Sequence, residues 1–287
     1  MYATPLGKFV VVQERNPLRL LACQARVSDT PSATDRDRHV VSLCERIAHY
    51  LDQNDTVDLI VLPELCTLHY SREVFQSLDD LAELLNGPSV ERFAELARTT
   101  GAVVVFGMAR RTKSGFRISQ VFMSATGELA GYYDKMHLCQ YGASCEKEFF
   151  ECGEKMITVD IKGWTVAPLI CYDIRIPEMS RALVLEHDAD LLLHCGAYFR
   201  DESFSTWHSF ATTRAMENQV YLLSLNRAGK NFGNSIFCLP WMDEAHPADH
   251  FAEYAEEFRV LKLDPDLPAK TRSVYTFLKD RHDHYRV

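Results

Sequence analysis

The chain of 287 residues lacks the features that mark several specialised classes of protein. It contains no apolar run near the roughly 18 residues that span a bilayer, and residues 1–19 lack the regions of a signal peptide. Its 31 Lys and Arg residues are outnumbered by 40 Asp and Glu residues and form no cationic stripe, which argues against nucleic acid as a partner. We therefore expect a cytoplasmic protein with neither a membrane nor a nucleic-acid partner.

The cysteines lack the spacings of a disulfide framework or a zinc site. There are nine, an odd number, and they are scattered along the chain. His137, Cys139, Cys145 and Cys152 are close in sequence, but they form neither a C-x2-C nor an H-x3-5-H pair. We predict reduced thiols, most of them buried as small apolar side chains, and no metal site.

A linker and an internal repeat are also missing, because no stretch of Gly, Ser or Pro is long enough to separate two domains. The composition, 47% apolar and 25% charged, is ordinary for a globular protein. The economical prediction is one domain over residues 1–287, with an N-terminal extension at 1–18 and a C-terminal tail at 264–287.

Apolar segments of strand length alternate with amphipathic segments of helical period, which is typical of an α/β domain. The predicted strands cover residues 19–26, 57–62, 102–109, 117–124, 157–161, 164–170, 189–194, 219–226, 234–239 and 258–263. The predicted helices cover residues 36–52, 71–85, 89–100, 177–187 and 203–217. Two short links, at 112–115 and 125–127, join strands through a Gly turn, so we also expect antiparallel pairs.

Three apolar segments end directly on a reactive side chain. One precedes Glu64, one precedes Lys135 and one precedes Cys171. Ligands of layered α/β proteins bind at the ends of strands, so these three groups are able to meet in one pocket. Pro177 follows Cys171 closely and is able to start a helix, which predicts a tight strand-to-helix turn at the sulfur.

Each of these residues also has an ordinary structural interpretation. Cys171 is one of nine cysteines, and most free cysteines are buried and inert. Glu64 is able to cap the N-terminus of a helix, and Lys135 is able to pair with Asp134 at the surface. Taken one residue at a time, these interpretations stay open.

Together the three segments resemble the nitrilase (carbon–nitrogen hydrolase) superfamily, whose triad is Glu, Lys and Cys in that chain order. The matching strings are Leu62-Pro63-Glu64, YDKMHL at residues 133–138 and CYDIRIPE at residues 171–178. Further matches lie at Glu146-Lys147, residues 214–218, Asn226 and Gly229, so the resemblance spans roughly residues 19–287. Tyr172 follows the cysteine where true nitrilases carry Trp, which resembles the amidase-like branches.

The resemblance implies a four-layer α-β-β-α sandwich and a homodimer or larger homo-oligomer. It also implies that Glu64 is the general base, Lys135 stabilises the tetrahedral oxyanion, and Cys171 is the nucleophile. Glu146 is similar to the family's second carboxylate, which positions the substrate or Lys135. A thiol needs a base, and the developing oxyanion needs a cation and a backbone donor, here the Tyr172 N–H, so the chemistry requires no cofactor.

Three further residues, Tyr70, Arg175 and Tyr198, are candidates for contacts with the substrate. Arg175 is able either to hold a substrate carboxylate through two guanidinium nitrogens or to join a structural ion-pair network. Residues 214–218 favour a structural Arg/Glu pair at the end of a helix.

The expected function is hydrolysis of a carbon–nitrogen bond in a small amide or N-carbamoyl (ureido) compound, through a thioester on Cys171. Two alternatives stay open, namely a catalytically silent scaffold or binding protein and an acyltransferase that uses an amine acceptor. A silent member is expected to have lost a triad residue, and all three are present. Departures from the family pattern at Cys152, Met242 and residues 243–254 indicate remodelled loops and leave the particular substrate open.

Overall fold

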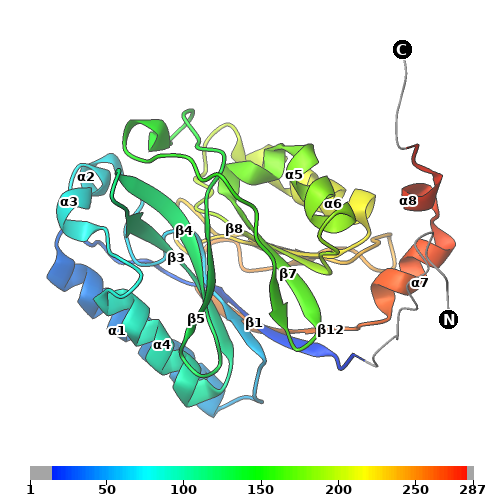
Figure 1. The fold of residues 1–287 in the computed structure, drawn as a ribbon, viewed down its shortest axis with the longest axis horizontal. Helices are drawn as coiled ribbons and strands as arrows, with labels where there is room; N and C mark the ends of the chain where they lie inside the picture. The colour runs from blue at the N-terminus through cyan, green and yellow to red at the C-terminus, as the bar shows by residue number, and fades with distance from the viewer. Residues whose placement is uncertain (1–14, 283–287) are drawn as a thin grey trace.

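Two six-stranded sheets of mixed direction form the centre of the protein, in a computed structural model that describes residues 15–282 (Figure 1). The first sheet has the order β12-β1-β2-β3-β4-β5 and the second the order β11-β10-β9-β8-β7-β6. The strands of the first sheet are β1 (Leu18–Gln24), β2 (Leu59–Val61), β3 (Val103–Arg111), β4 (Phe116–Met123), β5 (Leu129–Asp134) and β12 (Glu257–Leu263). Those of the second are β6 (Val159–Ile161), β7 (Trp164–Ile170), β8 (Leu191–Cys195), β9 (Tyr221–Leu225), β10 (Ile236–Cys238) and β11 (Asp249–His250).

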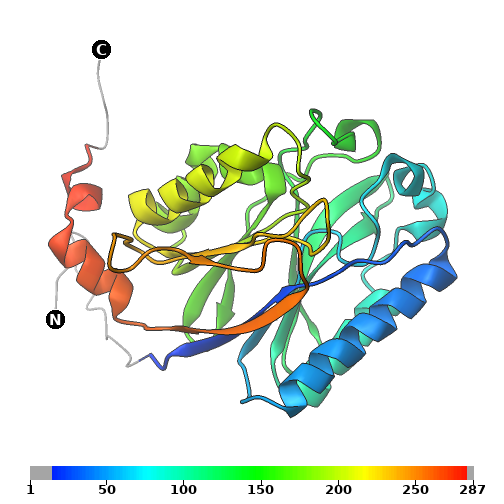
Figure 2. The same cartoon turned by 180° about the vertical axis from the view of Figure 1, so that it is seen from behind.

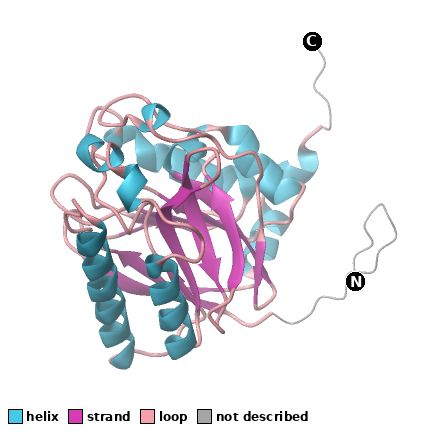
Figure 3. Cartoon of the chain, turned by 60° about the vertical axis from the view of Figure 1, so that its left-hand side comes forward, coloured by secondary structure: helices cyan, strands magenta, loops and turns pink. Residues whose placement is uncertain are grey.

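Helices cover the outer face of each sheet. The long helices α1 (Ala33–Asp52) and α4 (Pro88–Thr100) pack side by side on the first sheet, and α5 (Pro177–Leu185) and α6 (Phe204–Asn218) cover the second (Figures 1 and 2). Figure 3 shows the strands enclosed between these two helical layers. The predicted four-layer α-β-β-α sandwich is confirmed.

Apolar side chains fill the space between the layers. The core between the two sheets includes Leu20, Val61, Val105, Val166, Leu193 and Leu223, all fully buried. Strands that are covered on both faces need continuous apolar runs, and all five residues of β8 are buried. The sequence pattern that predicted these strands therefore arises from their position between a second sheet and a layer of helices.

The two helices on the first sheet have local signals at their ends. Ser32 caps α1, since its side chain accepts the N–H of Asp35. Pro88 occupies the first turn of α4, and Gly101 ends that helix with φ +66°, a left-handed conformation that favours Gly.

Across the described part of the chain, no helix combines the length and apolar character needed to cross a membrane.

The prediction of a single helix over residues 71–85 is wrong. The structure has two short helices there, α2 (Arg72–Phe75) and α3 (Leu78–Leu81), after which the chain becomes extended. The N–H of Glu83 donates to Ala109 O (3.1 Å), and the N–H of Arg111 donates to Glu83 O (2.7 Å), both on β3. Pairing with the part of β3 that the short strand β2 does not reach therefore replaces helical hydrogen bonds, and a local pattern does not record this competition.

Two elements in the predicted C-terminal tail were not expected as helices, namely α7 (Leu267–Val274) and α8 (Phe277–Asp280). The Trp241 ring stacks on Tyr275 with 3.7 Å between ring centroids, and Gln219 Nε2 donates to Tyr275 O (2.7 Å). The segment between the two helices is thus attached to α6 and to the loop after β10. Strand β11, which lies within residues 243–254, was also not predicted.

Gly107 on β3 has no room for a side chain, because an added Cβ would lie 2.5 Å from Leu65 N and Pro63 O. These atoms belong to the segment that carries Glu64. Overpacking of a tight core typically costs about 1–3 kcal/mol. We therefore expect Gly107→Ala to lower the free energy of unfolding by about this amount, as measured by urea denaturation. Gly131→Ala on β5 is the matched control, since its Cβ would lie 3.5 Å from Val159. Equal stability of the two variants would contradict this prediction.

Candidate active site

Glu64 lies just beyond the end of β2 and is almost fully buried. Its Oε1 accepts from Lys135 Nζ (2.8 Å), and its Oε2 accepts from the N–H of Ala197 (2.8 Å). The next helix along the chain begins only at Arg72, so this carboxylate does not cap a helix N-terminus. Of the two interpretations that the sequence allowed, the structure supports a partly desolvated carboxylate inside a site.

Lys135 follows β5 and is completely buried between two carboxylates. Its Nζ lies 2.8 Å from Glu64 Oε1 and 2.7 Å from Glu146 Oε1. Asp134 pairs with Arg110 instead, so Lys135 is not its surface partner. Burial alone would lower the pKa of Lys135, but the charges of Glu146 and Glu64 outweigh it and raise that pKa well above its usual value, so the ammonium keeps its proton.

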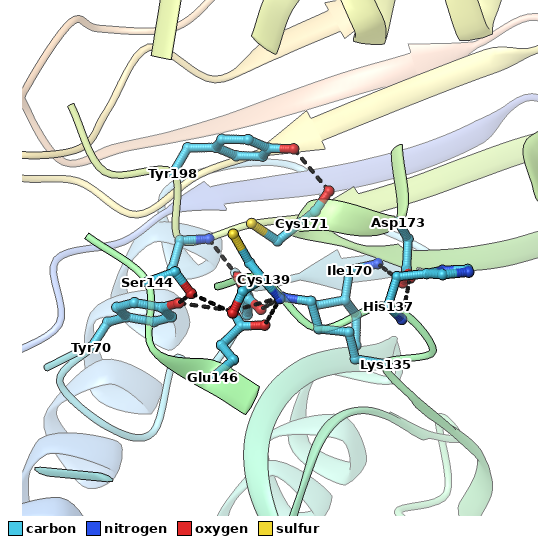
Figure 4. A network of polar contacts seen from close by, with 12 residues as sticks. Tyr70, Lys135, His137, Cys139, Ser144, Glu146, Ile170, Cys171, Asp173 and Tyr198 are labelled. Carbon is cyan, nitrogen blue, oxygen red and sulfur yellow. Dashed lines mark hydrogen bonds and ion pairs between the residues drawn. The ribbon is translucent and has the colours of Figure 1, made fainter. Parts of the chain in front are cut away.

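Glu146 begins the short 3₁₀ helix η1 (Glu146–Glu148) and is held by three donors. Besides Lys135, Tyr70 OH donates to its Oε1 (2.8 Å) and the N–H of Cys139 donates to its Oε2 (2.9 Å). Figure 4 shows Tyr70, Lys135 and Glu146 meeting from different segments of the chain. Tyr70 thus contacts the second carboxylate as well as the pocket that is described below.

Cys171 occupies a strained turn between β7 and the 3₁₀ helix η2 (Cys171–Arg175). Its φ of +45° lies in the left-handed region, which residues other than Gly rarely adopt. Asp173 stabilises this turn, because its Oδ2 accepts from the N–H of Ile170 (2.9 Å) and from Tyr133 OH (2.7 Å). Helix α5 then begins at Pro177, as the sequence predicted.

The electrostatic surroundings keep the thiol protonated in the resting site. Burial raises the pKa of Cys171 well above its usual value; the charge of Glu64 raises it further, and Lys135 opposes both effects. Burial also raises the pKa of Glu64 above that of an ordinary carboxyl group, although Lys135 again opposes the shift. A thiol of high pKa beside a carboxylate of raised pKa is an arrangement suited to proton transfer from sulfur to oxygen.

One pocket contains the sulfur and all three candidate substrate residues. The cavity itself is small in this structure, with a volume of about 30 Å³. It is lined by Tyr70, Cys139, Tyr141, Ala143, Ser144, Cys171, Tyr172, Arg175, Ala197, Tyr198, Phe199, Asp201 and Ser203. The Tyr172 N–H lies in the first turn of η2, where backbone N–H groups have no partner within the helix.

Arg175 and Tyr198 have different partners in this pocket. The Arg175 guanidinium packs over the rings of Phe210 (4.8 Å) and Tyr141 (5.6 Å). Its Nε and Nη2 are buried, and neither has a hydrogen-bond partner among residues 15–282. Arg175 therefore does not join a structural ion-pair network with any of residues 15–282, which was one of the two roles that the sequence allowed. Tyr198 OH instead donates to the carbonyl of Cys171 (2.8 Å).

Several residues that support the site were not singled out from the sequence. His137 Nδ1 lies 2.8 Å from Asp173 Oδ1, and this hydrogen bond raises the pKa of His137. Arg227 is fully buried, and burial lowers its pKa to about 10; it donates to carbonyls of the segment after Glu64, including Leu68 O (2.6 Å). Asp173 and His137 lie inside the quoted motifs, and Arg227 lies just beyond a strand end, which is the signal that could have identified it.

The 214–218 string has the structural position that its pattern favoured. Arg214 Nη1 lies 2.9 Å from Glu217 Oε1, and its Nε donates to Ile174 O (3.0 Å). Helix α6 therefore holds the backbone of η2 from outside the pocket.

Within residues 15–282, no group of three or more His, Cys, Asp and Glu side chains is arranged to hold a metal ion.

The four-layer sandwich, with a buried Glu-Lys-Glu cluster beside a cysteine at a strained turn, places the protein in the class of nitrilase-like hydrolases. Residues 22–257 match the model of the carbon–nitrogen hydrolase family, and the chain belongs to this family. It is a hydrolase of carbon–nitrogen bonds other than peptide bonds, of the amidase-like type.

Similar proteins include two bacterial amidases and one yeast structure. The chain is 29% identical over 210 residues to omega-amidase YafV of Escherichia coli K12, covering 73% of this chain and 77% of that protein. It is 29% identical over 268 residues to an (R)-stereoselective amidase of a Pseudomonas species, covering 92% of this chain and 90% of that protein. The crystal structure of Saccharomyces cerevisiae Nit3, a nitrilase-superfamily member, matches with a TM-score of 0.76 at 22% identity. The match covers 90% of this chain and 94% of that one.

We predict that Cys171 is the one cysteine whose removal abolishes turnover, because only its thiol lies at the strained turn beside Glu64 and Lys135. Cys171→Ala should therefore have no measurable activity in an ammonia-release assay. Cys139→Ala and Cys145→Ala are the controls, since both side chains are buried near the site. Activity in Cys171→Ala together with its loss in either control would show that the nucleophile is assigned wrongly.

Glu64→Gln should suppress acylation by about 10² to 10⁴-fold, the usual contribution of a general base. Folding should be nearly intact, because Lys135 keeps its ion pair with Glu146. Since the pKa of Glu64 is raised, the base form is lost as pH falls through that pKa. The acid limb of kcat/KM should thus lie above the usual Glu value of about 4.3. A variant within about threefold of wild type would rule out the role as base.

Proposed function

We propose that the protein hydrolyses the terminal amide of a small molecule that carries a carboxylate at its other end, such as the monoamide of a short dicarboxylic acid. The observation that carries this proposal is the unpaired guanidinium of Arg175 in the pocket that contains Cys171. The general reaction, cleavage of an amide carbon–nitrogen bond, follows from the family. The carboxylate requirement comes from this one side chain.

Arg175 is half-buried, and leaving its buried Nε and Nη2 without a partner is costly, since each buried donor that lacks a hydrogen bond costs about 1–3 kcal/mol. The aromatic rings of Phe210 and Tyr141 offset part of this cost through cation–π contacts. The Nε and Nη2 atoms form one edge of a planar fork that matches the two oxygens of a carboxylate. An anionic substrate would supply the partner that Arg175 lacks.

In the proposed first half-reaction, Glu64 takes the proton of the Cys171 thiol while the sulfur attacks the amide carbon. The carbonyl oxygen gains negative charge, which Lys135 Nζ and the Tyr172 N–H stabilise. Glu64 then gives the proton to the leaving nitrogen, the carbon–nitrogen bond breaks, and ammonia departs. The acyl group remains on Cys171 as a thioester.

In the second half-reaction, Glu64 takes a proton from water, which attacks the thioester through a second tetrahedral oxyanion. The carbon–sulfur bond breaks and the thiolate recovers a proton, so the products are a carboxylic acid and the free enzyme. No cofactor takes part in either step. Glu146 binds the same Lys135 Nζ as Glu64, which supports a positioning role for the second carboxylate.

Two of the similar proteins support an amide substrate. The Escherichia coli relative is an omega-amidase and the Pseudomonas relative an amidase by name. The direct test is an ammonia-release screen across monoamides of dicarboxylic acids, neutral amides of equal length, ureido acids and nitriles, with Cys171→Ala as the blank. Equal rates on neutral and carboxylate-bearing amides would overturn the carboxylate requirement.

Arg175→Met should lower kcat/KM for a carboxylate-bearing amide by about 10- to 100-fold, the range expected when a hydrogen bond to a charged group is lost. Met preserves most of the side-chain length, so a neutral amide should change by less than about threefold. Arg175→Lys keeps the charge without the planar fork and should fall between these values. An equal loss on both substrates would instead show a structural role.

The homodimer and the cytoplasmic location belong to the proposal. Closed symmetric oligomers are common, and the family resemblance favours one here. Light scattering after size exclusion should give at least twice the 32.8 kDa of one chain across the micromolar range. A monomer over this range would contradict the expected assembly and leave the catalytic proposal unaffected.

A further inference from the structure

The carbonyl oxygen of Cys171 accepts hydrogen bonds from two buried side chains that the mechanism above does not use. Tyr198 OH donates to it at 2.8 Å, and His194 Nε2 lies 2.9 Å from it. The two donor atoms are 3.3 Å apart. A carbonyl oxygen has two lone pairs, so this one is saturated. Figure 4 shows the contact from Tyr198.

A chain of buried hydrogen bonds determines the tautomer of His194. The indole N–H of Trp207 donates to Ser224 Oγ (2.7 Å), which leaves the serine proton free for His194 Nδ1 (2.7 Å). Burial lowers the pKa of His194 to about 4, so the ring is neutral near pH 7. Because Cys171 O is only able to accept, the 2.9 Å contact places the single ring proton on Nε2, and Nδ1 then accepts from Ser224.

Tyr198 is held just as firmly. Its ring stacks on Trp207, with 4.5 Å between centroids and 8° between planes, and only 5% of the residue is exposed. Gly196 makes this position possible, because an added Cβ would lie 2.5 Å from Tyr198 Cδ2. The hydroxyl therefore has little freedom to leave Cys171 O.

The geometry points to His194 and Tyr198 as positioning residues that orient and polarise the peptide group between Cys171 and Tyr172. That peptide is planar and trans, so its N–H points away from its C=O, and fixing the oxygen fixes the direction of the N–H. Hydrogen bonds to a C=O also strengthen the N–H of the same peptide as a donor. The inference rests on the proposed function, in which the Tyr172 N–H holds the oxyanion.

The backbone of Cys171 makes such support necessary. A left-handed φ of +45° at a residue with a side chain persists only where the surroundings hold it. Before the turn, Asp173 accepts a hydrogen bond from the N–H of Ile170, and after it His194 and Tyr198 bind the carbonyl oxygen of Cys171. The sulfur and the N–H that acts beside it are thereby fixed by the same turn.

The test compares two reactions of Cys171 that differ in their need for an oxyanion donor. A small aldehyde, propanal, adds to the thiol as a hemithioacetal: a carbon–sulfur bond forms, the C=O π bond breaks, and its oxygen becomes the oxyanion and then takes the thiol proton. Iodoacetamide alkylates the same sulfur by displacing iodide and forms no oxyanion at the attacked carbon. Neither reaction requires turnover of an amide.

Tyr198→Phe should weaken propanal binding by about three- to tenfold, the effect of one hydrogen bond, and leave the alkylation rate within about twofold. His194→Leu should do the same, and His194→Gln, which keeps an N–H donor, should recover most of the affinity. Tyr221→Phe is the control, since its buried hydroxyl bonds Asp264 O (3.1 Å) far from this peptide. With an amide substrate, kcat should fall by the same factor as propanal binding while KM stays within about twofold.

Unchanged propanal binding in Tyr198→Phe and His194→Gln would overturn the inference, because neither hydrogen bond would then matter to the oxyanion. A parallel fall in propanal binding and alkylation would also overturn it, because the residues would then only hold the turn. A wild-type protein that is alkylated but forms no propanal adduct would refute the Tyr172 donor itself. Failure of the proposed function would have a different result. The wild-type protein would then release no ammonia from any amide, while the Tyr198 and His194 variants would still lose propanal binding selectively.

Discussion

The site depends on one buried ammonium group held between two buried carboxylates. Lys135, Glu64 and Glu146 are removed from water together, and each ion would be costly alone. Their contacts of 2.7 and 2.8 Å, with backbone donors at Ala197 and Cys139, compensate for the lost hydration. Because these residues come from segments after β2, β5 and β8 and from η1, the cluster also ties the two sheets together at one edge.

This cluster explains why the nucleophile that we propose is a protonated thiol with a carboxylate beside it. One cation and two anions leave a negative surplus next to Cys171, and that surplus and burial both disfavour a thiolate. A proton acceptor is then required at the moment of attack, and the raised pKa of Glu64 suits that task. Removing Lys135 would leave two buried carboxylates without their shared cation, so a substitution there affects stability and activity together, whereas Glu64→Gln leaves Lys135 paired with Glu146.

The rest of the pocket has a division of roles that follows from hydrogen bonding. The side chains that hold the backbone of Cys171 all have hydrogen-bond partners. Tyr198 and His194 bind the Cys171 carbonyl, and Asp173 binds the N–H of Ile170 just before it. Arg175 has buried nitrogen atoms that no residue of 15–282 satisfies. The turn at Cys171 is thus held by residues whose hydrogen bonds are complete, whereas the neighbouring Arg175 has donors without a partner. Both features are expected of a preorganised site that binds a charged ligand.

The local sequence determined much of the framework, and the family resemblance carried by the sequence motifs supplied the expected roles of the reactive groups. The buried strand β2 is a continuous apolar run, and strands of this kind alternate with amphipathic helices, so an α/β domain was predictable, while the four-layer arrangement came from the family resemblance. Only the tertiary structure decided that Arg175 lacks a counter-ion, that Glu83 leaves a helix to pair with β3, and that a chain from Trp207 to His194 ends on Cys171. Each of these depends on atoms that are distant in sequence, and burial and hydrogen-bond partners are properties of packed neighbours that no local pattern records.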